Sequence, residues 1–139
     1  MKLNTLLSCA LLACAVPSLA IADGLVVIVN KANDNAVDKA LVAKIYRGES
    51  RTWAAGGSIS AFDLPEDNLL RDDFDSSVVG KSETALKTLW SQNVFTGKAL
   101  PPKVGVSEED VKKAVAANKN AIGYIQMHNV DDSVKVVVR

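Results

Sequence analysis

Histidine, the side chain most often used in acid–base catalysis and metal binding, occurs only once in this chain, as His128. A zinc or iron site needs several converging ligands, and a catalytic imidazole needs a partner that orients it. We therefore expect His128 to be structural or solvent-exposed. The G-x-S-x-G motif of serine hydrolases is also missing from the sequence. These observations predict a protein that is not an enzyme and has no metal or other cofactor.

Acidic residues gather in one segment, as Asp72, Asp73 and Asp75. Two carboxylates placed close together can act as a general acid and a general base. Here the three lie on a predicted helix with intervening apolar residues. We therefore interpret them as a solvated helix face rather than as a catalytic pair.

One candidate anion-binding segment is Gly80-Lys81-Ser82. It resembles the end of a phosphate-binding P-loop and precedes a predicted helix. Asp75, however, stands where the first glycine of that motif belongs, and the preceding segment is a predicted helix rather than a strand. A helix N-terminus can hold a small anion through its free N–H groups. The interpretation that we favour is that Ser82 caps its helix.

The second candidate is the turn from Leu64 to Asn68, which is followed by Arg71. The Arg71 guanidinium can donate two parallel hydrogen bonds to a phosphate or a carboxylate. The alternative is an ion pair with Asp67 or Asp75 at helical spacing, and we consider that alternative the stronger one.

Strands alternate with helices along the chain and must position these residues. Short β-branched runs predict strands at 25–29, 58–63, 121–126 and 133–138. Apolar residues at helical spacing predict four helices, centred on 37–45, 69–74, 86–94 and 111–115. The expected start signals are Asn33 to Asn35, Pro65, Ser82 and Ser107. This order predicts a three-layer α/β/α sandwich in which helices cover a mostly parallel or mixed sheet.

The composition fits one soluble globular domain. The chain has 139 residues, of which 48% are hydrophobic, 23% charged and 5% aromatic, and this length allows one substantial core. The 16 basic and 16 acidic side chains balance, and no basic block occurs. Binding to a phosphate backbone needs clustered lysine and arginine. We therefore exclude nucleic acid as the main partner.

Residues 1–22 have the pattern of a secretory signal peptide. Met1-Lys2 gives the positive start, an apolar run follows, and Ala20-Ile21-Ala22 matches the small residues read by signal peptidase. We therefore expect a domain over residues 23–139 that is exported to the periplasm. No other apolar stretch has the length of a membrane span.

The signal segment contains both cysteines, Cys9 and Cys14, so residues 23–139 have no thiol. The alternative is a lipoprotein signal, in which Cys14 would carry a lipid anchor. We favour the soluble product because Leu12 is bulky beside that cleavage point and the apolar run continues past Cys14.

Three blocks of the sequence carry a family resemblance. They are Val26 to Asn33 (VVIVNKAN), Ile45 to Gly48 with Trp53 shortly after, and Asn120 to Ile125 (NAIGYI). In this order they resemble blocks of the phosphate-binding periplasmic receptors of ABC importers. Shorter matches lie between them, at Leu64-Pro65-Glu66, Arg71, Phe74, Gly80-Lys81, Trp90, Phe95-Thr96-Gly97 and Pro101-Pro102. The resemblance implies a type 2 periplasmic binding protein fold for residues 23–139.

The blocks are similar to those of the second of the two receptor lobes, so the resemblance implies a single lobe. The family's phosphate loop carries an arginine, an acidic residue and then S-G-T, and it would fall near Leu64 to Leu70. Here Leu69 and Leu70 stand where the hydroxyl and the close backbone approach are needed. On the resemblance we expect Asn30, Asn68 and Arg71 to bind the ligand, with weak or altered affinity.

Two functions remain open. The first is a solute-binding module that takes phosphate or another small oxyanion and works with an ABC importer permease or a sensor. The second is a non-transport periplasmic interaction protein that kept the lobe fold and lost the anion site. It would act through another periplasmic protein or through a second copy of the chain.

Overall fold

Five strands form one mixed sheet in the order β3-β2-β4-β1-β5. In the computed structural model, which describes residues 24–139, β2 runs parallel to β3 and β4, and β1 runs antiparallel to β4 and β5. The strands are β1 (Leu25–Asn30), β2 (Ser60–Asp63), β3 (Lys103–Val104), β4 (Ala121–Gln126) and β5 (Val134–Val138). The predicted signal peptide, residues 1–22, lies outside the described residues.

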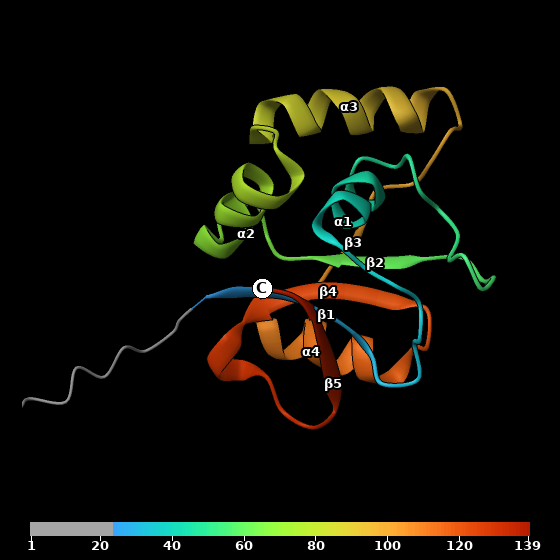
Figure 1. The fold of residues 1–139 in the computed structure, drawn as a ribbon. Coiled ribbons are helices and arrows are strands. Elements are labelled where there is room, and N and C mark those ends of the chain that lie inside the picture. Colours follow the sequence, from blue (N-terminus) through green and yellow to red (C-terminus); the bar gives the residue numbers. More distant parts are fainter. Residues whose placement is uncertain (1–23) are drawn as a thin grey trace, which may run out of the picture.

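Four helices cover the two faces of the sheet. They are α1 (Lys39–Tyr46), α2 (Leu69–Phe74), α3 (Glu83–Phe95) and α4 (Glu108–Ala117). Helices α1, α2 and α3 lie on one side and α4 lies on the other (Figure 1), which confirms the predicted three-layer α/β/α architecture. Within residues 24–139, no helix is both long enough and apolar enough to span a bilayer.

Side-chain caps start all four helices. The Ser82 and Ser107 hydroxyls accept hydrogen bonds from Ala85 N and Asp110 N, both at 3.2 Å, as predicted. The other two caps differ from the prediction. Helix α1 is capped by Asp38, because the Asn33 side chain instead accepts two hydrogen bonds from Asn35 and holds that segment in a turn.

Helix α2 begins four residues after Pro65. Pro65 to Asn68 forms a turn in which Asn68 N donates to Pro65 O at 3.0 Å, and Asn68 caps the helix. After Phe74 the helix widens into a π-helical turn over Asp75–Val79, which ends at Gly80 with φ of 76°.

The inner strands β1 and β4 form the centre of the core. Residues 26–29 and 121–125 are buried. Gly123 faces α4, where an added Cβ would lie 2.5 Å from Val111 Cγ1. Tyr124 faces the opposite layer and stacks on Phe74 with ring centroids 3.8 Å apart. The glycine therefore lets α4 approach the sheet, while the neighbouring tyrosine anchors α2.

Helix α3 is confirmed, and only Leu86 and Asn93 within it are buried. Leu86, Leu89, Trp90 and Val94 form one apolar stripe, of which only Leu86 is buried, and Val94 is 48% exposed. The C-terminal half of the helix borders two clefts, which Trp90 and Val94 both line. Asn93 fixes the helix to the end of α1 through a hydrogen bond to Arg47 O, at 3.3 Å.

Candidate functional site

The carboxyl ends of β2 and β4 meet at one edge of the sheet, and α2 begins beyond that edge. Asn68 and Arg71 both lie there. Asn30 ends the antiparallel strand β1 and therefore lies at the opposite edge. Its Nδ2 donates to Val115 O at 2.9 Å and Ala116 O at 3.0 Å, the free carbonyls of the last turn of α4. The structure thus brings two of the three predicted ligand residues together and leaves Asn30 apart.

Arg71 is held by groups of the protein itself. Its Nη1 donates to Leu64 O at 2.8 Å, Nη2 lies 3.5 Å from Asp63 Oδ2, and Nε lies 3.7 Å from Asp75 Oδ2. Only 16% of the side chain is exposed. The ion pair with Asp75 at helical spacing is confirmed. This ion pair is buried, however, and Asp63 provides a second carboxylate beside the same guanidinium.

Asp75 corrects a prediction. Asp72 and Asp73 are exposed, but Asp75 is only 4% exposed and does not belong to a solvated face. Helical spacing places it on the same face as Arg71 and Phe74, where the guanidinium offsets its charge. Burial, followed by the negative charge of Asp63, raises the pKa of Asp75 from 3.8 to about 7.

Asp63, at the end of β2, is the second buried carboxylate. Its Oδ1 accepts hydrogen bonds from Tyr124 OH and, at 2.9 Å, from Leu64 N. Burial raises the pKa of Asp63, and the hydrogen bond from Tyr124 and the charge of Arg71 act against that rise. Two carboxylates therefore share a single guanidinium at this edge. When both are ionised the group carries a net negative charge.

The backbone N–H groups at the start of α2 are also partly used by the protein. Asn68 Oδ1 accepts from Leu70 N at 2.9 Å, and that N–H is one of those an anion at the helix terminus would need. Leu69, where the resemblance places a small residue, is 79% exposed. The edge therefore offers an incoming anion one paired arginine and a capped helix.

A cleft of about 790 Å³ opens beside Arg71, between α2, α3 and the segment that leads into β3. Its apolar wall includes Leu86, Trp90 and Val94. Its charged residues are Asp63, Glu66, Asp75 and Glu83 against Arg71 and Lys87. Because carboxylates outnumber cations, the local field opposes a small anion. Within residues 24–139, no group of three or more His, Cys, Asp or Glu side chains is placed to hold a metal ion.

A family model described as a PBP superfamily domain matches residues 15–137 of the chain. The chain belongs to this family. No curated protein matches it.

Several solved structures share the fold of this PBP domain. An ABC-type phosphate transport receptor from Vibrio cholerae is 25% identical with a TM-score of 0.65, over 83% of this chain and 45% of the receptor. A protein from Clostridium perfringens, described as a phosphate ABC transporter substrate-binding protein with bound phosphate, is 27% identical with a TM-score of 0.67, over 83% and 44%. PstS from Borrelia burgdorferi is 15% identical with a TM-score of 0.63 and shows the same fold. The PBP domain therefore spans less than half the length of these proteins.

Sequence reasoning found Arg71 in this PBP domain and its ion pair with Asp75, but it missed Asp63 and Tyr124. The spacing of Arg71 and Asp75 is the local signal that predicted their ion pair. Asp63, at the carboxyl end of a predicted strand, gives a weaker one. Tyr124 gives none, because its contact with Asp63 exists only once β2 and β4 are neighbours.

Proposed function

We propose that the protein is an exported, solute-binding-like PBP domain of the phosphate-receptor type, with weak or altered oxyanion binding. The observation that carries this proposal is the state of Arg71, which is tied to Asp63, Asp75 and the Leu64 carbonyl. An anion at this guanidinium competes with two carboxylates that are already desolvated beside it. In this phosphate-receptor fold, the guanidinium of Arg71 is therefore already paired with protein carboxylates and a carbonyl.

The ligand and the partner in this proposal come from the likeness to solved structures. The Clostridium perfringens protein holds phosphate, and the Vibrio cholerae protein is a transport receptor. We accordingly propose phosphate or another small oxyanion as the ligand, an ABC importer permease as the partner, and the periplasm as the location. Asn68 and Arg71 are the proposed ligand groups, and a ligand role for Asn30 stays a prediction.

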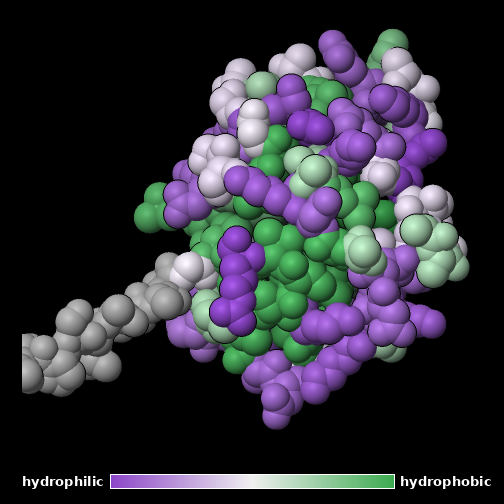
Figure 2. Space-filling view, in the orientation of Figure 1, coloured by the Kyte–Doolittle hydropathy of each residue, from purple (hydrophilic) through white to green (hydrophobic). Residues whose placement is uncertain are grey.

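A second candidate is a periplasmic interaction protein that has lost the anion site. The observation that favours it is a set of exposed apolar side chains near the end of α3 and around β3, namely Val94, Phe95, Leu100, Val104 and Val106. Phe95 is 93% exposed. Apolar surface also gathers over β1 and β5 (Figure 2), where Val136, Val137 and Val138 are only partly buried. Such surface is typical of protein–protein contact.

Titration calorimetry of the exported protein with phosphate, sulfate and methylphosphonate tests the first candidate. We expect dissociation constants in the millimolar range and loss of the binding heat in Arg71→Gln. Lys113→Gln, which removes an exposed cation on α4, is the matched control. Circular dichroism verifies that each variant is folded.

The outcomes separate the two candidates. A micromolar or tighter constant would refute weak binding. No heat with any of the three oxyanions would reject the receptor function and favour the interaction protein, and sedimentation of the same sample would then show whether two copies associate.

A further inference from the structure

The cleft of about 790 Å³ beside Arg71 has the composition of a small-molecule site. Its apolar walls come from one face of α3 and from the segment that leads into and includes β3, namely Leu86, Trp90, Val94, Pro101, Pro102 and Val104. A volume of several hundred Å³ and a mostly apolar lining with a few polar groups are typical of sites for small organic molecules. We name it the acidic cleft, for the buried carboxylates of Asp63 and Asp75 in its lining.

The charged groups deep in the acidic cleft converge. The Asp63 side chain points to the α2 side of the sheet, because it accepts a hydrogen bond from Tyr124, whose ring stacks on Phe74. Arg71 on α2 and Asp75 after it approach Asp63 from that side. The guanidinium lies within ion-pair distance of both carboxylates, 3.5 Å from Asp63 Oδ2 and 3.7 Å from Asp75 Oδ2. The three charges therefore form one buried group.

The apolar walls face the same space. Val104 is the neighbour of Asp63 in the parallel register of β2 and β3, so the two side chains lie on the same face of the sheet. Leu86, Trp90 and Val94 are spaced four residues apart along α3 and share one face of that helix. A ligand in the acidic cleft therefore meets the buried carboxylates together with apolar side chains from α3 and β3.

The buried group has one cation fewer than it has carboxylates, because Asp63 and Asp75 share the guanidinium of Arg71. Asp75 is only 4% exposed, and its carboxylate accepts no hydrogen bond from any of residues 24–139. Burial and the charge of Asp63 raise the pKa of Asp75 to about 7. Buried charges in proteins are normally paired and hydrogen-bonded. The Asp75 carboxylate therefore has acceptor capacity left for a cation in the cleft.

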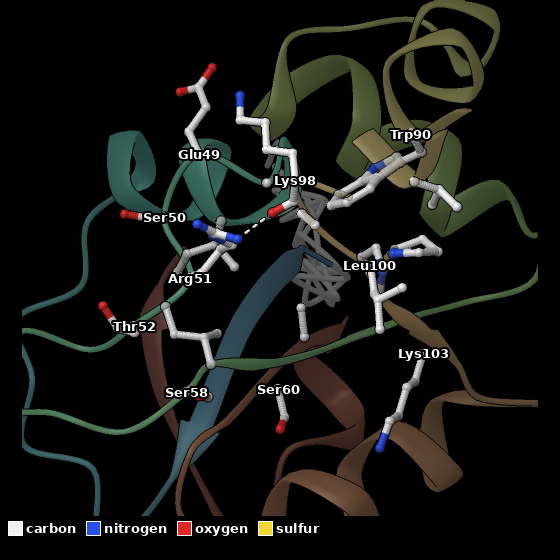
Figure 3. A pocket seen from close by; sticks show the side chains of 18 of the residues that line it. Glu49, Ser50, Arg51, Thr52, Ser58, Ser60, Trp90, Lys98, Leu100 and Lys103 are labelled. Atoms are coloured by element: carbon white, nitrogen blue, oxygen red, sulfur yellow. Dashed lines mark hydrogen bonds between the residues drawn. The ribbon is translucent and has the colours of Figure 1, made fainter. Parts of the chain in front are cut away.

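A second cleft, of about 830 Å³, also has Trp90 in its wall, but its charged groups do not converge (Figure 3). Arg51 donates a hydrogen bond to the carbonyl oxygen of Lys98, drawn as a dashed line. The ammonium groups of Lys98 and Lys103 lie at opposite ends of the view. The acidic cleft thus differs from this one in having its charges gathered at one point.

We propose that the acidic cleft binds an organic cation, namely an ammonium group carried on an apolar chain or ring. The ammonium group donates hydrogen bonds to Asp75 and pairs with Asp63, so that two carboxylates face two cations. The apolar body lies against Leu86 and Val94 and against the ring of Trp90. The inference goes beyond the proposed oxyanion binding and does not rest on it, because this ligand has the opposite charge.

Calorimetry of the exported protein with a matched series of probes tests the inference. Phenylbutylamine, phenylbutanol and phenylbutyrate have similar shapes and are cationic, neutral and anionic, and butylamine lacks the ring. At about pH 8, where Asp75 is ionised, we expect phenylbutylamine to bind roughly tenfold or more tightly than phenylbutanol. Phenylbutyrate should bind more weakly than the alcohol. Butylamine should bind roughly tenfold or more weakly than phenylbutylamine, because burial of the ring is lost.

A variant and amide NMR spectra give the second arm of the test. Asp75→Asn keeps the shape of the side chain and should weaken phenylbutylamine binding roughly tenfold, while phenylbutanol binding stays unchanged. Asp73→Asn removes an exposed carboxylate on the same helix and is the matched control. Circular dichroism verifies that both variants are folded. During titration with phenylbutylamine we expect amide shifts at Asp75 and Leu86, which line the acidic cleft, and none at Thr52 and Ser58, which line the second cleft.

Each contrary outcome overturns a stated part of the inference. Phenylbutylamine affinity no greater than that of phenylbutanol, or unchanged in Asp75→Asn, would reject the ammonium site. The comparison of probes uses the wild type, so it decides even if the variant does not fold. Shifts at Thr52 and Ser58 with none at Asp75 would reject the acidic cleft.

The same series separates this inference from the proposed function. Tightest binding by phenylbutyrate would overturn the cation and support Arg71 as an anion site. No heat with any of the four probes would overturn the acidic cleft as a cation site. The phosphate and sulfate titrations decide the oxyanion proposal independently.

Discussion

Neutralising Asp75 should stabilise the protein above neutral pH. The pKa of Asp75 is raised from 3.8 to about 7 in the folded protein, with burial as the main cause. The folded state therefore keeps the Asp75 proton in a range where the unfolded chain has released it. As the pH rises from about 4 to about 7, ionisation of Asp75 stabilises the unfolded state but not the folded state. The free energy of unfolding therefore falls.

The size of this effect follows from the shift. One pKa unit corresponds to about 1.4 kcal/mol, so the full shift bounds the cost at about 4 kcal/mol. The carboxylate lines a cleft that water enters, and this screening reduces the expected cost to about 2 kcal/mol. Asp75→Asn has nearly the same shape and no charge. Relative to wild type it should gain about 2 kcal/mol of unfolding free energy between about pH 4 and pH 8.

Urea unfolding of both proteins, followed by tryptophan fluorescence across this pH range, measures the difference. Titration of groups that both proteins share cancels in that difference to first order. Asp73→Asn removes an exposed carboxylate two residues away and is the matched control. A wild-type-to-variant difference that does not change with pH would refute the reasoning. An equal pH-dependent gain in the control would refute burial as its cause.

Three further substitutions test contacts that hold the fold together. Gly48→Ala should cost about 1–3 kcal/mol in urea unfolding, because Gly48 has φ of 76° and a Cβ there would lie 3.0 Å from Trp90 Cη2. Ser107→Ala should lower the unfolding free energy by about 1 kcal/mol through loss of the α4 cap. Gly123→Ala should destabilise by about 1–3 kcal/mol through overpacking against Val111. Adding Val111→Ala to Gly123→Ala should show favourable coupling in a double-mutant cycle, and additive losses would contradict the contact.

The sequence predicts the central layer of this fold well. Strands β1 and β4 are continuous apolar runs because both of their faces are covered, and such runs are recognisable without tertiary information. Ser82 and Ser107 are equally local signals, since a cap depends only on the next three residues.

The parts that sequence reasoning missed depend on distant neighbours. Strand β3 has two residues, Lys103 and Val104, and it is a strand only because it pairs with Phe62 and Asp63. No periodicity exists in so short a segment. The hydrogen bond between Tyr124 and Asp63 likewise joins residues 61 positions apart, through the pairing of β2 with β4. A local pattern predicts which side chains could bind a ligand. Their neighbours in the fold decide whether those side chains are already paired with protein groups.

The ionisation of Asp75 also links the state of Arg71 to pH. The charged groups acting on Asp75 are Asp63, Arg71, Asp72 and Glu83, with burial as the largest cause of its raised pKa. Above about pH 7 the ionised carboxylate competes with any anion for the guanidinium, and below it the neutral carboxyl does not. Sulfate keeps the same charge throughout this range, so its affinity reports the protein alone.

Sulfate bound at Arg71 should therefore bind more tightly at about pH 6 than at about pH 8, by a factor of about three to ten, since a nearby charge in a wet cleft is worth about 1 kcal/mol. Asp75→Asn should bind sulfate at both pH values as tightly as wild type does at the lower one. Calorimetry of the two proteins at the two pH values measures this. Sulfate affinity that is independent of pH in the wild type, and unchanged in Asp75→Asn, would contradict binding at Arg71, because that guanidinium has Asp75 as a direct neighbour.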